Sequence, residues 1–128
     1  MIVAGVGCRA GATAGEIEAA IVEALDRAGV AAAELAAIAT SQTKAAEPGI
    51  VAAASGRGLR LVAVPQAAFV EAGERTVTHS ERVLELTGVP SIAEAAALAA
   101  GGPGARLLAP RVAVGPATCA LAIAGDAP

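Results

Sequence analysis

The sequence predicts an α/β fold: a single three-layer domain in which helices cover both faces of a mixed sheet of about five strands. Two observations predict it. Short apolar runs bounded by glycine or proline alternate with segments of helical periodicity, and near the end of the chain two strand-like runs follow each other closely. The chain has 128 residues and no visible linker or internal repeat, so we expect residues 1–128 to form one domain.

The first expected elements are a strand, a helix and a second strand. Residues 1–7 (MIVAGVG) are a short apolar run that ends in glycine, which is typical of a buried strand. Thr13 and Glu16 have the spacing of a capping box and begin a helix that Gly29 ends. Residues 35–39 (LAAIA) form the next buried strand.

The middle of the chain continues this alternation. Residues 40–44 (TSQTK) are a polar loop, and residues 48–55 predict a helix because proline suits its first turn. Residues 59–64 (LRLVAV) predict a third strand, and residues 65–72 predict a short helix. The polar residues 73–80 (GERTVTHS) show no strong period, so we expect a loop there.

The last third predicts two more helices and two closing strands. One helix is expected over residues 80–86. Ser91 and Glu94 form a second capping box, which begins an alanine-rich helix to about residue 100 and gives Glu94 no need of a further role. After a GGPG turn come the two closing strands, expected at residues 106–109 and 117–124 with a hairpin through residues 111–116.

Composition and charge exclude several classes of protein. The net charge is −3, with one Phe and no Tyr or Trp, so the chain lacks the basic face and the stacking platforms of a nucleic-acid binder. Its longest uncharged stretch, residues 112–125, is shorter than the roughly 18 to 20 residues that a membrane span needs. No signal peptide is visible. Cys8, Cys119 and one histidine form neither a disulfide framework nor a metal site. We therefore expect a cytoplasmic protein without metal or cofactor.

The first candidate site is the glycine-rich loop after the first strand, residues 5–11. Its sequence GVGCRAG has the glycine spacing of a dinucleotide fingerprint, but the second strand ends in Thr40 and Ser41 and not in the acidic residue that the fingerprint requires. Two interpretations stay open: the loop binds an anion through its backbone N–H groups, or it is a tight turn needed for packing. Cys8 is likewise either a small buried hydrophobe or a thiolate.

The second candidate is the segment TSQTKAAEP, residues 40–48. It follows the second strand, at the edge where open α/β sheets bind their ligands. It holds Lys44, the one lysine of a chain with eight arginines, and a compact ammonium is not equivalent to a planar guanidinium. Glu47 lies three residues further on. A surface ion pair between Lys44 and Glu47 is the more frequent outcome in such a segment, and contact between Lys44 and a ligand is the alternative.

The third candidate is the end of the polar loop, where His79 lies between Thr78 and Ser80. A Ser–His catalytic pair needs contact in space, which adjacency in sequence does not provide. Ser80 as a helix cap and His79 as an exposed loop residue is the more frequent outcome. If the strands are assigned correctly, one crevice at their C-terminal ends is lined by residues 7–11, 40–44 and 76–80.

Four segments of the chain carry a family resemblance: AGVGCRAG, IATSQTKAAEPGIVAAA, VPSIAEAAALAAGG and RLLAPRVAVGPATCALA. They occur in the family's order and cover nearly the whole chain. Through them the chain resembles the CobE/CbiG C-terminal domain family of cobalamin biosynthesis, and within it the free-standing CobE proteins. The resemblance implies a three-layer α/β domain that acts on corrin-ring precursors.

The resemblance also implies which residues matter. The positions that match the family are Gly5, Gly7, Cys8, Arg9, Gly11, Thr40, Lys44, Glu47, Pro48, Ser91 and Glu94. Many members have an acidic residue immediately before the matching Glu, where this chain has Ala46. That departure weakens any mechanism that needs two adjacent carboxylates.

We therefore expect a protein that binds a corrin-ring precursor as a carrier or accessory factor. The expected ligand-binding residues are Gly5, Gly7, Cys8, Arg9, Gly11, Thr40, Lys44, Thr78 and Ser80. Two alternatives stay open. One is a hydrolase or isomerase that acts on a precorrin, for example by opening a lactone, with Glu47 as general base and Lys44 stabilising an oxyanion. The other is a non-catalytic partner subunit of another cobalamin-pathway enzyme.

Overall fold

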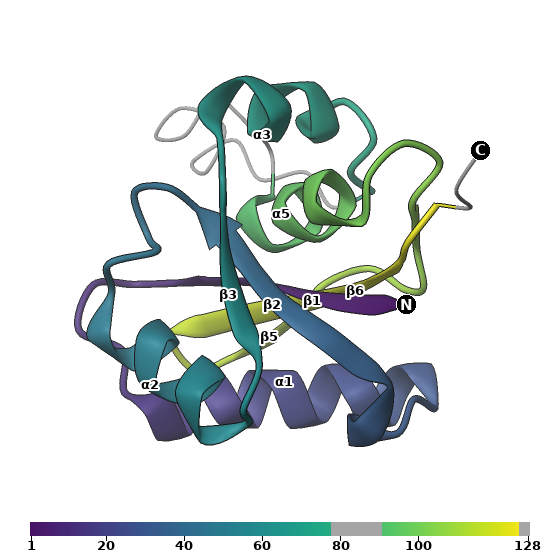
Figure 1. Ribbon diagram of the computed structural model, residues 1–128. Coiled ribbons are helices and arrows are strands. Elements are labelled where there is room, and N and C mark those ends of the chain that lie inside the picture. The colour runs from purple at the N-terminus through teal and green to yellow at the C-terminus, as the bar shows by residue number, and fades with distance from the viewer. Residues whose placement is uncertain (78–90, 126–128) are drawn as a thin grey trace.

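The computed structural model describes residues 1–77 and 91–125 as a three-layer α/β domain (Figure 1). The strands are β1 (Ile2–Cys8), β2 (Leu35–Ser41), β3 (Arg60–Val64), β4 (Arg106–Leu107), β5 (Val112–Val114) and β6 (Ala117–Ile123). The helices within these ranges are α1 (Ala14–Ala28), the short 3₁₀ helix η1 (Ala32–Glu34), α2 (Pro48–Gly56), α3 (Gln66–Gly73) and α5 (Ile92–Gly101). The predicted fold class is confirmed.

The sheet is mixed, in the order β3-β2-β1-β6-β4, with β5 also paired to β6. Strands β1, β2 and β3 are parallel, whereas β6 runs antiparallel to β1 along its whole length, from Ile2 opposite Ile123 to Cys8 opposite Ala117. The C-terminal ends of the three parallel strands therefore meet at one edge of the sheet, and β6 begins at the same edge.

The sheet has six strands where we expected about five. The strand expected over residues 106–109 is only two residues long, and the expected hairpin connection contains a further strand, β5, paired with the start of β6. Leu108 N still donates to Leu121 O at 2.9 Å, beyond the end of β4. Pro110 follows. Because proline has no N–H, it interrupts the hydrogen bonds between this segment and β6.

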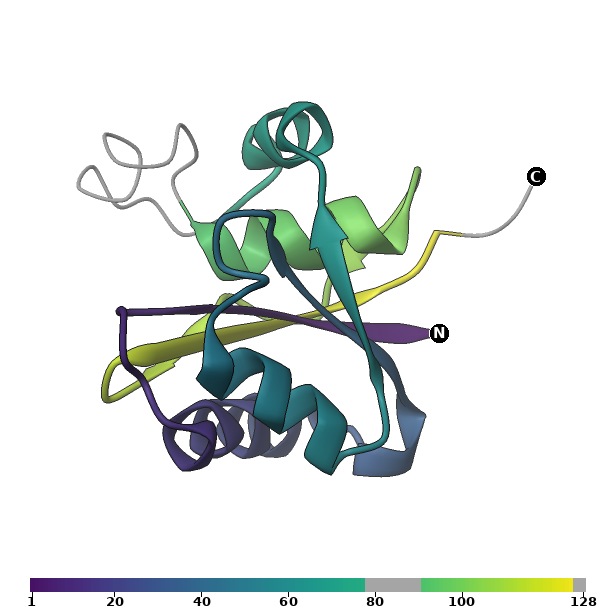
Figure 2. The same ribbon diagram turned by 60° about the vertical axis from the view of Figure 1, so that its left-hand side comes forward.

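Helices α1 and α2 cover one face of the sheet (Figure 2). The capping box predicted at Thr13 and Glu16 is present, and Gly29 ends α1 in the left-handed conformation with φ of 66°. The buried side of α1 carries Ile17 and Ile21, at the spacing that places them on one face. This face of the domain therefore follows directly from the local sequence pattern.

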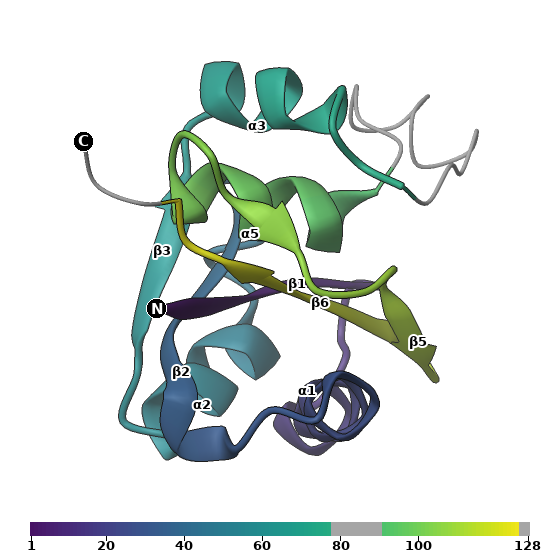
Figure 3. The same ribbon diagram turned by 90° about the vertical axis from the view of Figure 1, so that its right-hand side faces the viewer.

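Helices α3 and α5 cover the opposite face, with α5 between the sheet and α3 (Figure 3). Phe69, the one aromatic residue of the chain, is 1 % exposed in the core on this side. The buried residues of α5 include Ala93 and Ala97, whose small side chains let the helix approach the sheet closely. The helix predicted over residues 80–86 lies outside the described residues. No helix that the structure describes has both the length and the apolar character to cross a bilayer.

The contact between α5 and β1 depends on Gly5. A Cβ atom at Gly5 would lie 2.0 Å from Ala93 O and 2.6 Å from Ala97 N, both backbone atoms of α5. Neither atom can turn aside, since each belongs to the regular hydrogen-bonded helix. Glycine at this position is therefore a packing requirement.

Gly5→Ala should destabilise the protein by about 3 kcal/mol, because the added methyl forces β1 and α5 apart. Gly56→Ala is the matched control: no atom lies within 4 Å of its would-be Cβ, and it lies in a helix, so it should stabilise by up to about 1 kcal/mol. Urea unfolding followed by circular dichroism measures both. Equal stability of the two variants would contradict the packing requirement.

Candidate functional site

Two loops meet at the sheet edge where the parallel strands end. One, residues 9–13, joins β1 to α1; the other, residues 42–47, joins β2 to α2, and Figure 1 shows them side by side. Gly11 N donates to Glu47 Oε1 at 2.7 Å across 36 residues of sequence. Gly49 packs against the same loop, since a Cβ there would lie 2.2 Å from Ala12 O. The structure thus brings together the first two predicted candidates.

Two further elements border the loop of residues 9–13. Pro116 O, in the turn between β5 and β6, accepts a hydrogen bond from Arg9 N at 2.9 Å. The N-terminus of α5 lies over the end of β1, because a Cβ at Gly7 would lie 3.2 Å from the side chain of Ile92. Thr118 at the start of β6 donates through Oγ1 to Gly7 O at 3.3 Å. The loop and the end of β1 are therefore held against elements from the last third of the chain.

Four backbone N–H groups of the loop of residues 9–13 have hydrogen-bond partners within the protein. Arg9 N donates to Pro116 O (2.9 Å) and Gly11 N to Glu47 Oε1 (2.7 Å). Ala12 N donates to Arg9 O (3.2 Å) and Thr13 N to Glu16 Oε1 (2.9 Å). An anion would have to displace these bonds to use the same donors. The geometry therefore favours the tight-turn interpretation of this loop over the anion-binding one.

Three of the predicted site residues are buried and support the others. Gly5 and Gly7 lie beneath α5, and Thr40 is 0 % exposed. Thr40 Oγ1 donates to Val6 O at 2.8 Å and so cross-links β2 to β1 just before the loops begin. These residues fix the position of the edge and do not reach its surface.

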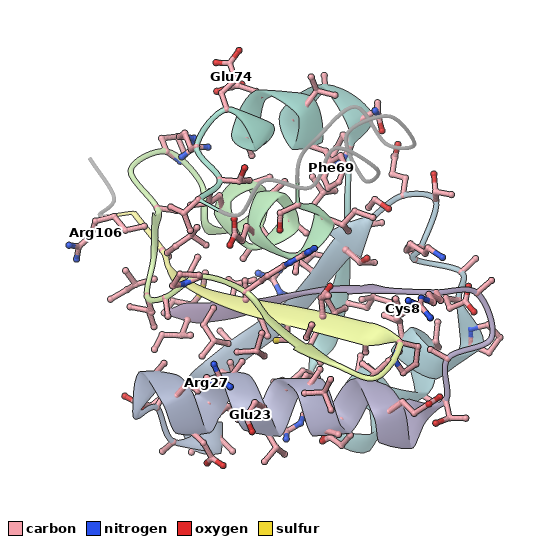
Figure 4. The ribbon with its side chains drawn as sticks, turned by 180° about the vertical axis from the view of Figure 1, so that it is seen from behind. Cys8, Glu23, Arg27, Phe69, Glu74 and Arg106 are labelled. Atoms are coloured by element: carbon pink, nitrogen blue, oxygen red, sulfur yellow. The ribbon has the colours of Figure 1, made fainter. Side chains whose placement is uncertain are left out.

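The accessible part of the predicted site consists of five residues on the two loops and the end of β1. Arg9 and Gly11 are exposed, whereas Cys8, Lys44 and Glu47 are half-buried. Figure 4 shows Cys8 at this end of the sheet, remote from Arg106 at the opposite end. Thr78, His79 and Ser80 lie outside the described residues, so their place relative to this edge is not part of the structure described.

Lys44 and Glu47 do not form the surface ion pair that we judged the more frequent outcome. The ion pairs among residues 1–77 and 91–125 are Arg27 with Glu23, and Arg57 with Glu18. Glu47 instead turns its carboxylate to Gly11, while the backbone N–H of Lys44 donates to Ser41 O at 3.1 Å and to Ser41 Oγ at 3.3 Å. The turn is fixed, and the ammonium of the half-buried Lys44 has no carboxylate partner in the described part of the chain.

The two cysteines are both in the protonated thiol form near neutral pH. Burial raises the pKa of the Cys8 thiol, and the Lys44 cation opposes this shift in part. Burial also raises the pKa of Cys119, to about 12, in the core beside β1. Both thiols are free. The interpretation of Cys8 as a thiolate nucleophile is therefore not favoured by its surroundings.

Glu94 has a role that the sequence analysis missed. Its carboxylate is 0 % exposed and accepts hydrogen bonds from Val77 N at 2.8 Å and from Arg111 N at 2.9 Å. Ser91 Oγ accepts from Glu94 N at 3.4 Å, as expected of the helix cap. The expectation that Glu94 needs no role beyond a capping box was wrong, because its carboxylate joins two distant segments to α5. No sequence signal marks this, since both donors are backbone groups.

The described residues include no cluster of metal-ligating side chains, and a small cavity lies away from the two loops. Within residues 1–77 and 91–125, no three His, Cys, Asp or Glu side chains are grouped so that they could hold a metal ion. A cavity of about 10 Å³, room for roughly one water molecule, is lined by Ala24, Arg27, Ala28, Ala109, Pro110, Val112, Cys119, Ala120 and Leu121. None of these residues belongs to the two loops at the sheet edge.

Comparison with known proteins gives consistent matches over nearly the whole chain. Residues 2–122 match the family model described as cobalamin synthesis G C-terminus. Protein CobE from Sinorhizobium sp. is 35 % identical over 121 residues, which are 94 % of this chain and 79 % of that protein.

Solved structures with the same fold include three cobalamin-related proteins. A crystal structure of CobE, from the cobalamin biosynthetic pathway, has a TM-score of 0.89 and 34 % identity over 95 % of this chain and 89 % of its own. Cobalamin biosynthesis protein chiG from Agrobacterium tumefaciens has a TM-score of 0.78 and 44 % identity, covering 98 % of this chain and 100 % of its own. A putative cobalamin biosynthesis protein G homolog from Sulfolobus solfataricus, at 20 % identity and TM-score 0.69, covers 96 % of this chain and 36 % of its own and shares the fold.

Glu94→Ala should destabilise the protein by roughly 3 kcal/mol, because the N–H groups of Val77 and Arg111 lose a buried acceptor. Glu94→Gln should cost less, since its amide oxygen can still accept one of these bonds. Glu71→Ala, at an exposed position of α3, is the control and should change stability by under about 0.5 kcal/mol. Urea unfolding of the three variants checks the order, and a neutral Glu94→Ala would show that the carboxylate is dispensable.

Native protein should react with a thiol reagent at Cys8 and not at Cys119, because Cys119 is fully buried. The reaction needs thiolate, and the raised pKa of Cys8 keeps it protonated near neutral pH, so the rate should climb as the pH rises through and beyond the ordinary thiol range. Mass spectrometry should find one label per native chain and two after denaturation. Cys8→Ser should abolish native labelling; two labels on the native protein would contradict the burial of Cys119.

Proposed function

Because the chain belongs to the cobalamin synthesis G C-terminus family and is a cobalamin biosynthesis protein, we propose that it binds a corrin-ring precursor as a carrier or accessory factor. The binding surface is the sheet edge formed by residues 9–13 and 42–47, together with the end of β1. Corrin precursors carry several carboxylate side chains around a broad apolar ring. Such a ligand needs cations at separate points of its rim.

One observation carries the proposal: Lys44 is a half-buried residue whose ammonium has no ionic partner among the described residues. No carboxylate in this part of the chain neutralises the charge, so it is available to a ligand. Glu47 is close in sequence and is committed to Gly11. A carboxylate of the ligand would supply the missing charge-assisted hydrogen bond.

Arg9 supports the same proposal from the neighbouring loop. Its side chain is exposed, while its backbone is fixed by the hydrogen bond to Pro116 O. Two cations of different shape then emerge from two loops that are joined through Glu47. The planar guanidinium suits a bidentate carboxylate contact, and the ammonium acts as a point charge. Because the loop N–H groups have internal partners, these side chains are the groups that recognise the ligand's acids.

Binding and turnover are measured together by titrating the protein with corrin-pathway intermediates, with and without cobalt, followed by absorbance and mass spectrometry. The chain has no Trp or Tyr, so the absorbance of the ring is read without protein interference in the near ultraviolet. Tight binding without conversion supports the carrier function. Conversion of a precorrin lactone supports the hydrolase alternative, and neither, with co-purification of a pathway enzyme, supports the partner-subunit alternative.

Lys44→Ala should weaken binding of a corrinoid with free side-chain carboxylates by about 10- to 150-fold, the equivalent of 1.5 to 3 kcal/mol for a lost charged hydrogen bond. Folding stability should change by under about 1 kcal/mol, since the ammonium has no partner to lose. Lys44→Arg should bind with intermediate affinity, because it keeps the charge and changes the shape.

Arg106→Ala is the matched control, because it removes a cation at the opposite end of the sheet (Figure 4). It should leave affinity unchanged within about threefold. The same corrinoid with its side chains amidated should bind weakly to the wild-type protein and equally weakly to Lys44→Ala. Wild-type affinity in Lys44→Ala would contradict the proposed site.

A further inference from the structure

We infer that Glu47 is a positioning residue, whose carboxylate fixes the loop that carries Arg9 against the turn that carries Lys44. The inference deepens the proposed function and rests on it to the extent that these two cations are the ligand contacts. It assigns Glu47 a role different from general base. The contact that carries it is the hydrogen bond from Gly11 N to Glu47 Oε1, 2.7 Å long.

The direction of the Glu47 side chain is the first argument. Glu47 precedes the first residue of α2 and occupies the N-cap position, yet its side chain makes no capping hydrogen bond to its own helix. Acidic side chains at this position usually accept from the first helical N–H groups. Here the carboxylate leaves the helix and reaches a loop 36 residues away in sequence. The bond therefore serves the relation between two loops and not the helix end.

The exposure of Gly11 is the second argument. Gly11 is exposed and has a φ of 83°, in the left-handed region that glycine adopts without strain. Water could satisfy its N–H at little cost, so the bond to Glu47 is not needed to rescue a buried donor. What the bond removes is conformational freedom of a glycine-containing loop. Its effect is to hold the loop, and with it Arg9, in one place.

The two other contacts that hold this loop against distant segments are made by backbone groups. Arg9 N is bonded to Pro116 O, and Ala12 O packs against Gly49 with no space for a side chain between them. Glu47 is the side chain that joins the middle of the loop to the neighbouring one. A substitution at Glu47 can therefore release the middle of the loop while its two ends stay attached.

The two roles of Glu47 differ in what glutamine can replace. A glutamine oxygen can accept the hydrogen bond from Gly11 N, but glutamine cannot take up a proton as a general base. Positioning predicts that Glu47→Gln keeps the function and Glu47→Ala loses it. Catalysis by Glu47 predicts that both variants fail. The pair of variants therefore separates the two roles without knowledge of the reaction.

The test compares Glu47→Gln and Glu47→Ala with Glu34→Ala as matched control. Glu34 Oε2 accepts from Ala31 N at 2.9 Å, so this control removes an equal charge and a similar bond at the opposite end of β2. Amide exchange with water, measured by NMR in the ligand-free protein, reports on Gly11 and Ala31 separately. The corrinoid with free side-chain carboxylates is then titrated into each variant.

Glu47→Ala should speed exchange at Gly11 by about tenfold or more and weaken corrinoid binding by a similar factor, because the loop is no longer held. Glu47→Gln should restore both to within about threefold of wild type. Glu34→Ala should speed exchange at Ala31 and leave Gly11 and binding unchanged. Unaltered exchange at Gly11 in Glu47→Ala would overturn the inference, as would a Glu47→Gln variant that protects Gly11 but binds as poorly as Glu47→Ala. If wild-type protein binds no corrinoid, the proposed function fails, while the exchange data still decide whether Glu47 holds the loop.

Discussion

The close approach of α5 to β1 is the constraint on which the rest of the structure depends. Because Gly5 has no Cβ, the backbone of α5 can lie directly on β1, with Ala93 O of the helix close to Gly5. This contact sets how closely α5 approaches β1, and the N-terminus of α5 lies over Gly7 at the same edge as the two loops. A larger residue at position 5 would move the helix outward and with it the buried Glu94 carboxylate. Alanine-rich helices tolerate such contact because their packing depends on backbone proximity and not on bulky side chains.

The candidate site is built by hydrogen bonds that cross long stretches of sequence. Gly11 is held by Glu47, Arg9 by Pro116, and the strands beneath by the hydroxyl of Thr40 on Val6 O. Two of these bonds satisfy loop N–H groups, and the third satisfies a carbonyl of the buried strand β1. At this edge, several backbone N–H groups of the two loops therefore already have partners within the protein. In the proposed function, recognition of the ligand therefore falls to side chains such as Lys44, which has no ionic partner among the described residues.

This distribution of charge suits a protein of cobalamin biosynthesis. Two other cations of the described chain pair with carboxylates: Arg27 with Glu23, and Arg57, at the end of α2, with Glu18 of α1. At the sheet edge the carboxylate of Glu47 is instead bound to a backbone N–H, which leaves the neighbouring cation available. A net charge of −3 would otherwise repel a polycarboxylate ligand. In the proposed function, Arg9 and Lys44, which have no ionic partner among the described residues, give such a ligand two cations to bind at this edge.

Sequence alone determined the α/β class, the helix boundaries set by the Thr13–Glu16 box and Gly29, and the position of the two loops after strands, because periodicity, capping and turn preference act over a few residues. It also sufficed to select Lys44 and Glu47 as candidates. Only the tertiary structure decided that these two do not pair, that the loop N–H groups are occupied, that Glu94 binds two distant backbone groups, and that a sixth strand forms beside β6. Each of these depends on which distant segment lies alongside. Backbone N–H groups are the same in nearly every residue, so the sequence does not indicate which acceptor each of them will bind.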